Sequence, residues 1–194
     1  MGNNDPEQLK TTYINLMAQI DNNSINQLMN SIEGKIKEGT ERFIILISSP
    51  GGSVFYGISA YNFLKGIPAE VFTHNYGSAD SIATVIFCAG IKRFCVPNAR
   101  FLIHGLGWNV PPGVRLEEKH LKEQVDSFKT DRENISKIIS DNCNKTVAEI
   151  EKDMLEGVTL NAQQAKEYGL VDEVKTQLFE KGADLIGIRQ LSKS

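Results

Sequence analysis

A serine and a histidine in this sequence stand where a hydrolase would need them. Ser81 follows the polar segment 75–80 and opens an apolar run, so we expect its hydroxyl at the start of a helix. His104 directly follows the strand-like segment 100–103. Both side chains therefore fall where strands end, the usual ligand edge of a parallel α/β sheet. An imidazole at that edge could activate the serine hydroxyl, although Ser81 could instead only cap its helix.

A glycine pair marks a second point at which chemistry is possible. The segment Ser49-Pro50-Gly51-Gly52 separates an apolar run from a helical pattern. Because glycine has no side chain, a ligand could approach the backbone N–H groups of this turn at the positive end of the helix. The turn could bind an oxyanion, or it could be a tight turn that only needs positive φ.

Two strand–turn–helix units position these residues. The run 41–48 is rich in β-branched residues and predicts a buried strand, and 54–64 predicts a helix. The same unit recurs as a strand over 70–74, a turn over 75–80 and a helix over 81–89. Two such units in series predict a parallel sheet with right-handed crossovers.

The remaining elements continue the α/β pattern without an internal linker or repeat. They are a helix over 23–37, short strands over 92–96, 100–104 and 170–174, and helices over 116–141, 146–154 and 161–168. The sequence therefore predicts a single domain over residues 1–194, with flexible ends over 1–11 and 182–194.

Composition excludes several classes of function. The 194 residues include 21 Lys and Arg against 24 Asp and Glu, so the net charge of −3 gives no reason to expect nucleic acid or an anionic membrane as a partner. No apolar run approaches the roughly 20 residues that cross a bilayer. The first ten residues lack the pattern of a secretion signal, which predicts a cytoplasmic protein.

Cysteine usage gives no sign of a disulfide framework or a metal site. Cys88, Cys95 and Cys143 are an odd number and include no Cys-x-x-Cys pair. Cys88 and Cys95 lie in apolar stretches and are expected to be small core residues. We expect neither a metal ion nor a cofactor.

Four motifs together resemble the Clp protease proteolytic subunit family, in its order and with nearly its spacing. They are Ser49-Pro50-Gly51-Gly52-Ser53-Val54, Gly77-x-Ala79-x-Ser81, Pro97-Asn98-Ala99-Arg100-x-x-Ile103-His104 and Glu167-Tyr168-Gly169-Leu170-Val171-Asp172. The resemblance covers roughly residues 12 to 175. It implies a ClpP/crotonase-like α/β superhelix of repeated β-β-α units with a protruding long helix.

The resemblance also implies roles for individual residues. Ser81 falls on the nucleophile and His104 on the general base, while Gly52 and Ile82 fall on the positions whose N–H groups form the oxyanion hole. The implied activity is ATP-dependent serine endopeptidase chemistry on peptides or unfolded proteins, inside a homo-oligomeric ring. The segment after Ser53 and the loop 106–110 would then pair with the substrate backbone.

The sequence departs from the family at the third catalytic position. An ungapped alignment sets Gly157 where the family has its aspartate. Glu156 or Asp153 could supply a carboxylate from nearby, or a water or backbone carbonyl could orient His104 in a weak dyad. The subunit could also be catalytically impaired. Reduced, dyad-like activity is favoured slightly over substitution by Glu156.

Other departures concern assembly and the nucleophile's neighbour. Asp80 replaces a small residue and could cap the helix or place a carboxylate beside Ser81, with the cap favoured. The charged residues that join rings in the family have no counterpart around 157–159. Only about eleven residues precede Thr12, and they do not match the segment that docks the unfoldase ATPase, so docking is doubtful.

Two further hypotheses compete with an active peptidase. A catalytically impaired subunit would build or regulate a ring without cleaving peptides. A crotonase-type acyl-CoA enzyme would also use paired N–H groups for an oxyanion. That class generally needs a positioned carboxylate, and the sequence offers no obvious basic cluster for CoA.

Overall fold

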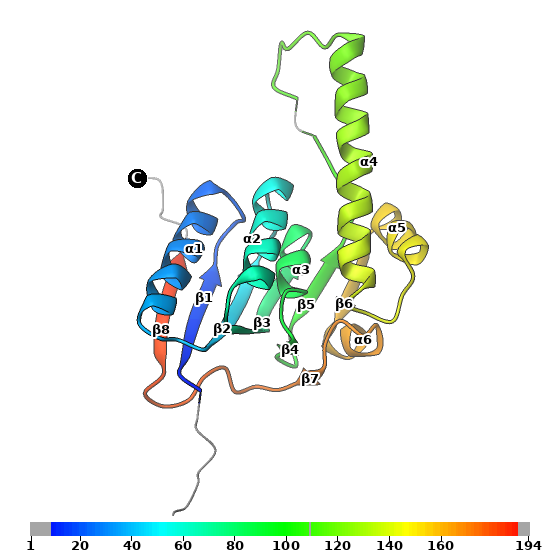
Figure 1. The fold of residues 1–194 in the computed structure, drawn as a ribbon. Helices are drawn as coiled ribbons and strands as arrows, with labels where there is room; N and C mark the ends of the chain where they lie inside the picture. The colour runs from blue at the N-terminus through cyan, green and yellow to red at the C-terminus, as the bar shows by residue number, and fades with distance from the viewer. Residues whose placement is uncertain (1–8, 109, 190–194) are drawn as a thin grey trace, which may run out of the picture.

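One mixed sheet organises the chain, and the helices are layered mainly on one of its faces (Figure 1). This computed structural model describes residues 9–108 and 110–189. Within those residues the sheet has eight strands: the order β6-β5-β3-β2-β1-β8 forms the main path, β4 pairs with β3, and β7 pairs with β4. All pairings are parallel except that of β5 with β6. The carboxyl ends of most strands therefore share one edge.

Most elements have nearly their predicted bounds, but the strands over 11–17 and 158–161 were not predicted, and only 173–174 of the predicted strand over 170–174 form one. The strands are β1 (Thr11–Met17), β2 (Arg42–Ser49), β3 (Glu70–Asp80), β4 (Lys92–Cys95), β5 (Arg100–Ile103), β6 (Val158–Asn161), β7 (Glu173–Val174) and β8 (Asp184–Arg189). The helices are α1 (Asn22–Lys37), α2 (Val54–Gly66), α3 (Ile82–Phe87), α4 (Glu118–Ser140), α5 (Val147–Glu156) and α6 (Ala162–Glu167). The α/β class is thus confirmed.

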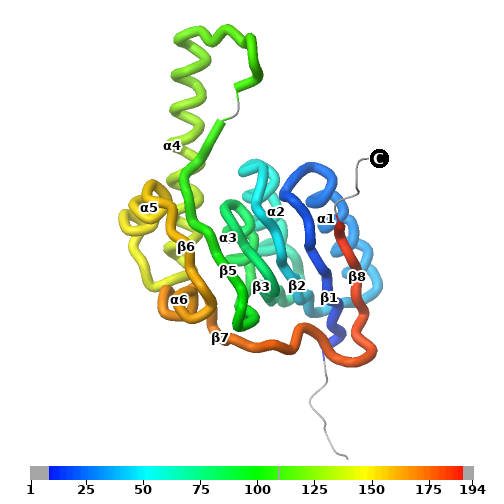
Figure 2. The backbone as a smooth tube through the Cα atoms, turned by 180° about the vertical axis from the view of Figure 1, so that it is seen from behind, coloured from blue at the N-terminus to red at the C-terminus, as the bar shows by residue number. Residues whose placement is uncertain are grey.

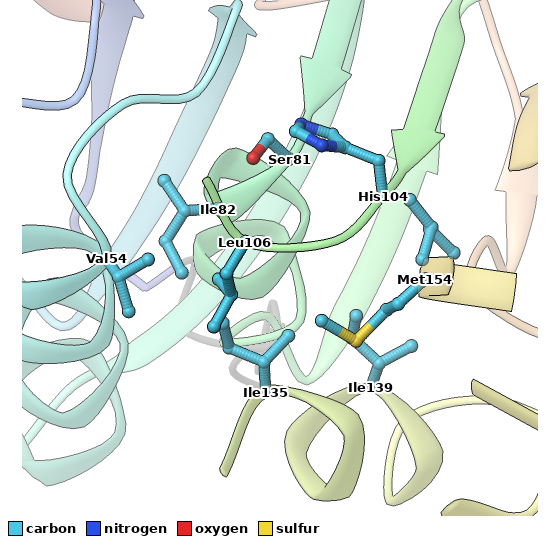
Figure 3. Close-up of a pocket in the computed structure, with 9 residues that line it drawn as sticks. Val54, Ser81, Ile82, His104, Leu106, Ile135, Ile139 and Met154 are labelled. Carbon is cyan, nitrogen blue, oxygen red and sulfur yellow. The ribbon is translucent and has the colours of Figure 1, made fainter. Parts of the chain in front are cut away.

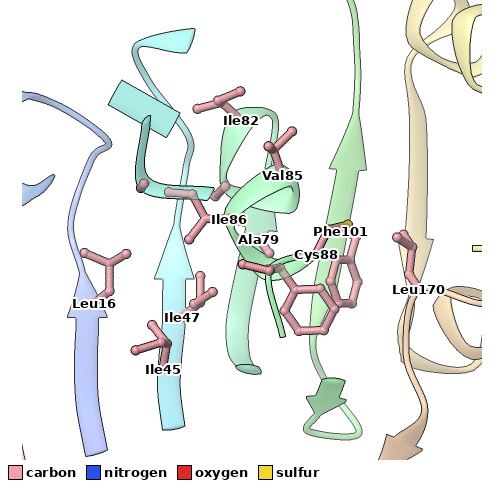
Figure 4. Packing of buried hydrophobic residues seen from close by; sticks show 14 of the residues in the cluster. Leu16, Ile45, Ile47, Ala79, Ile82, Val85, Ile86, Cys88, Phe101 and Leu170 are labelled. Carbon is pink, nitrogen blue, oxygen red and sulfur yellow. The ribbon is translucent and has the colours of Figure 1, made fainter. Parts of the chain in front are cut away.

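The hydrophobic core lies between the sheet and the helices and includes residues of all six helices from α1 to α6. Figure 4 shows the part of it around α3. Phe43, Ile45 and Ile47 of β2 point into it and are fully buried, whereas Ile44 on the other face is only half-buried. Burying an aliphatic or aromatic side chain of this size stabilises a fold by about 1.5–3 kcal/mol. Viewed from behind, the strands lie in front of the helices (Figure 2). Leu46, on the same face as Ile44, is buried, so the buried strand predicted over 41–48 is confirmed on the helix-covered face and in part on the other.

Strand β3 is longer than predicted, because the expected turn over 75–80 is part of it. Its first half pairs with β4 and its last residues, Ser78 to Asp80, pair with β5. The Asn75 side chain supports the exchange of partners: its amide donates to the carbonyl of Arg100 (2.8 Å) and its oxygen accepts from the N–H of Gly77 (3.1 Å). The polar residues of this segment are thus strand residues whose hydrogen bonds join β3 to β5.

The predicted flexible tail is wrong for residues 184–189. These residues form β8, which pairs in parallel with β1 from Thr12–Asp184 to Met17–Arg189. The pairing buries Ile188, and the Thr12 hydroxyl donates to the Asp184 carboxylate at 2.9 Å. At the other end, Thr11 belongs to β1 and is not part of a flexible leader. Residues 1–8 and 190–194, on which the rest of that prediction falls, lie outside the described residues.

Helix α4 extends beyond the body of the molecule at its N-terminal end (Figure 1). Its C-terminal half packs on the core through Ile135 and Ile139, whereas Leu121 and Val125 in the protruding half are about half exposed. The predicted long helix is therefore present with nearly its predicted bounds. No helix in residues 9–108 and 110–189 combines the length and apolar character that a membrane span requires.

Candidate active site

Ser81 occupies a strained elbow between β3 and α3. Its backbone has φ 57° and ψ −129°, and among the described residues it is the sole non-glycine with positive φ. Its N–H donates to the carbonyl of Leu102 on β5 at 2.7 Å. Strain of this kind costs about 1–3 kcal/mol and concentrates at functional sites. The Ser81 side chain makes no capping hydrogen bond, so the alternative that it only caps the helix is wrong.

His104 lines the same pocket as Ser81 (Figure 3). Asp80 pairs with Leu102, so the carboxyl ends of β3 and β5 lie side by side. Ser81 follows β3 and His104 follows β5, and the two residues therefore lie close together. In Figure 3 the imidazole ring lies beside Ser81, and no hydrogen bond is drawn between them. Apo enzymes often show loose catalytic contacts that tighten with substrate. The structure therefore brings together the two side chains that the sequence suggested.

The pocket around this pair is apolar and narrow. Its other lining residues are Val54, Ile82, Ile103, Leu106, Ile135, Ile139 and Met154. The cavity volume is about 20 Å³, little more than one water molecule occupies. A pocket of this size does not hold a substrate side chain in the conformation that the structure shows. The sequence did not predict this set of lining residues, because they come together from α2, α4 and α5 as well as from the strand ends.

Gly51 and Gly52 hold the turn after β2 against the elbow. A Cβ on Gly51 would stand 2.7 Å from both the Asp80 carbonyl oxygen and Ser81 Cβ. A Cβ on Gly52, where φ is 151°, would stand 2.2 Å from the carbonyl oxygen of Ile20. The alternative that these glycines only satisfy positive φ is therefore incomplete, because each also permits a backbone approach that no side chain would allow.

Two backbone N–H groups are available beside Ser81. Ile20 bridges Gly52 in parallel by donating to the Gly51 carbonyl and accepting from the Ser53 N–H, both at 2.8 Å. In such a bridge the N–H of the intervening residue, Gly52, points away from its partner. The N–H of Ile82 belongs to the first residue of α3, where it has no carbonyl partner within the helix. The Ile82 nitrogen lies 3.4 Å from where a Gly51 Cβ would stand.

The third catalytic position offers no carboxylate to the pocket. Gly157 ends α5 in the left-handed conformation, with φ 76°. The Asp153 carboxylate accepts from the Tyr168 hydroxyl at 2.6 Å, and Glu156 is exposed with Lys152 3.8 Å away. Burial first, and this bond second, raise the pKa of Tyr168. Both predicted candidates thus have partners elsewhere, and neither lines the pocket of His104.

Asp80 does not have its predicted role as a helix cap. It is the last residue of β3, it is 5% exposed, and its Oδ2 accepts from the Arg100 guanidinium. Nor does the carboxylate reach the nucleophile, because Asp80 and Arg100 line a separate shallow cleft on which Ser81 does not lie. Sequence reasoning missed the pair with Arg100, which only the register of β3 and β5 could have suggested.

The other histidines and the buried cysteines have structural roles. His74 is buried within β3, where its ring contacts the Lys175 carbonyl at 3.2 Å and burial lowers its pKa to about 4. His120 is exposed on α4. Cys88 and Cys95 are buried, which confirms their prediction as core residues, and burial raises the pKa of Cys88 to about 12. A thiol with that pKa is a poor nucleophile.

Comparison with known families identifies the family to which this chain belongs. A family model described as Clp protease matches residues 5–177. The chain belongs to the Clp protease family. The resemblance in the four motifs is thereby confirmed, and β8 lies beyond the matched residues. Members of the family are peptidases that act on peptide or protein substrates and are generally oligomeric.

Proposed function

We propose that this Clp protease family member is a serine endopeptidase that cleaves peptides or unfolded proteins through an acyl-enzyme at Ser81. The observation that carries the proposal is the strained Ser81 elbow, with His104 beside it in one apolar pocket. Strain at a nucleophile presents its oxygen at the end of a strand, as in the elbow of other serine hydrolases.

The reaction divides into acylation and deacylation. Ser81 Oγ attacks the scissile carbonyl carbon while His104 accepts the hydroxyl proton. The resulting oxyanion receives hydrogen bonds from the N–H groups of Gly52 and Ile82, each worth about 2.7–4 kcal/mol in a comparable enzyme. His104 then gives its proton to the leaving amine. Water, activated by the same imidazole, hydrolyses the ester and restores the serine.

The absence of a carboxylate at Gly157 makes this a dyad. In the well-studied serine proteases the aspartate holds the histidine tautomer, and its loss lowers the rate about 10⁴-fold. We therefore expect slow turnover but intact geometry for acylation. The carbonyl oxygen of Met154 lies 3.4 Å from where a Cβ on Gly105 would stand, and the pocket includes Met154. That end of α5 is the place from which a backbone carbonyl could orient His104.

A fluorophosphonate probe tests the proposal. The probe phosphonylates an activated serine, so the wild-type chain should gain one label, and Ser81→Ala should gain none. His104→Ala should slow labelling strongly, because no base then accepts the proton. A Ser59→Ala variant is the matched control, since that serine lies on α2 outside the pocket. Equal labelling of wild type and Ser81→Ala would contradict the proposal.

A catalytically impaired subunit is the second candidate, and Gly157 is the observation that favours it. Such a subunit would build or regulate an oligomer around an active homologue. It predicts no probe labelling and no peptide cleavage, together with intact assembly. If Ser81 is labelled, however slowly, and the labelling depends on His104, the result supports the peptidase over the impaired subunit.

A further inference from the structure

Asp80 and Arg100 form an ion pair between the strand that carries the nucleophile and the strand that carries the base. Asp80 is the last residue of β3 and directly precedes Ser81. Arg100 is the first residue of β5, which ends at Ile103 directly before His104. The Arg100 guanidinium donates to Asp80 Oδ2. The pair thus spans the two strands that must keep the serine and the histidine in register.

The hydrogen bond from the Asn75 amide to the Arg100 carbonyl also joins these two strands. Strands β3 and β5 pair only over Ser78–Arg100, Ala79–Phe101 and Asp80–Leu102. In this register Asp80 lies two residues beyond the partner of Arg100, so the ion pair crosses the ladder diagonally. A diagonal side-chain contact of this kind adds to the backbone ladder in opposing a slide of one strand along the other. The 2.7 Å hydrogen bond from the Ser81 N–H to the Leu102 carbonyl lies next to this ion pair.

Stability alone does not account for Asp80. The side chain is 5% exposed, yet its Oδ1 is buried and has no hydrogen-bond partner within residues 9–108 and 110–189. A buried carboxylate oxygen without a partner costs free energy, and an ion pair whose other member, Arg100, is 57% exposed adds little stability. These costs argue that the carboxylate at this position serves a requirement other than stability. The neighbouring residue that such a requirement would serve is Ser81.

We infer that Asp80 and Arg100 are positioning residues that hold the Ser81 elbow in register with His104, an inference that rests on the proposed function. Neither side chain touches the pocket in which the reaction would occur, because both line a different cleft together with Ser49 and Pro50. The pair acts through the backbone: it fixes where β3 ends, and thereby where the hydroxyl stands. A displacement of about 1 Å at a reacting group can cost a hundredfold in rate.

Probe labelling of matched variants tests the inference. Asp80→Asn and Arg100→Gln should each slow the labelling of Ser81 by roughly tenfold to a hundredfold. The double variant should be no slower than either single variant, because the two side chains act as one unit. Arg100→Lys keeps the charge and should recover part of the rate. For a cleaved peptide, kcat should fall while KM is unchanged, since neither residue contacts the substrate pocket.

A second ion pair on the same strand provides the control. Arg42 and Glu70 join β2 to β3 at 2.6 Å, at the opposite end of β3. Glu70→Gln removes the same kind of contact and should leave the labelling rate unchanged. The inference is overturned if Asp80→Asn labels as fast as the wild type. It is also overturned if the rates fall only in parallel with the melting temperature, or if the Glu70→Gln variant slows equally.

Hydrogen exchange separates this inference from the proposed function. The Ser81 amide is bonded to Leu102, so peptides that contain it should exchange faster in Asp80→Asn and Arg100→Gln, and unchanged in Glu70→Gln. This readout needs no activity. A wild type that never labels but shows the expected exchange pattern contradicts the peptidase and keeps the register role. Unchanged exchange in the Asp80→Asn variant contradicts the register role itself.

Discussion

At the scale of single residues, the proposed site of Ser81 and His104 lacks one side chain of a complete triad. Gly157 closes α5 in the left-handed conformation, and a Cβ built there would meet no atom within 4 Å. Space is therefore not what keeps a carboxylate out. Asparagine and aspartate tolerate left-handed backbone better than other residues with side chains, so this position can be tested by substitution.

Gly157→Asp should increase the rate at which Ser81 is labelled. The added carboxylate would stabilise the imidazolium form of His104, an effect that reaches about 10⁴-fold in other serine proteases, and we expect at least tenfold. The backbone cost of replacing this glycine should lower stability by about 1 kcal/mol. The matched control is Gly157→Asn, which carries the same backbone cost without the charge. Equal labelling of both variants would show that the carboxylate is not what the site lacks.

At the scale of the elements, β8 extends the sheet beyond the part that matches the family. It pairs with β1 through Ile188, which is 1% exposed, while Leu185 on the same strand is 44% exposed. Substituting these two residues of one strand therefore distinguishes the contribution of core packing to stability from that of surface contacts. It also shows that the end of the described chain contributes to the core of the molecule.

Ile188→Ala should destabilise the protein by about 2–5 kcal/mol, because it removes buried aliphatic atoms and leaves a cavity. Leu185→Ala should cost less than about 1 kcal/mol, since that side chain is already close to half exposed. Urea denaturation followed by circular dichroism measures both values. Equal midpoints for the two variants would mean that β8 does not pack as described.

The elements that could be predicted from the sequence are those with a local signal. The glycine turn after 41–48 was predictable because two glycines follow a β-branched run. The position of His104 was predictable because it directly follows a strand-like segment. Strand β8 was not, because Asp184 to Arg189 includes a glycine and charged ends, and its partner β1 lies more than 160 residues earlier. The Asp80–Arg100 pair depends on strand register, which no local pattern encodes.

At the scale of the whole molecule, the protruding half of α4 carries exposed apolar side chains away from the body of the molecule. Leu121 and Val125 are both about half exposed, and charged residues surround them on the helix. Exposed apolar side chains on a projecting element favour contact with another chain. Family members are generally oligomeric, and we expect copies of this chain to associate through this helix.

Sedimentation velocity at micromolar concentration should show a species many times the 21.5 kDa mass of the chain. The double substitution Leu121→Glu and Val125→Glu should shift the protein toward smaller species, because it places charge in the contact. Glu123→Gln, on the same exposed part of α4, serves as the control and should leave the distribution unchanged. A sharp monomer for the wild type would contradict assembly.

The parallel pairing of β8 with β1 also determines where an attached reporter group would emerge. Because Arg189 lies opposite Met17, the last described residue sits at the carboxyl edge of the sheet, the edge at which Ser81 also lies. Thr11 begins β1 at the opposite edge. The chain therefore leaves β8 at the edge of the sheet that carries the proposed nucleophile and enters β1 at the opposite edge, so an N-terminal reporter joins the sheet at the edge away from Ser81. Kinetic comparisons should use the N-terminal fusion.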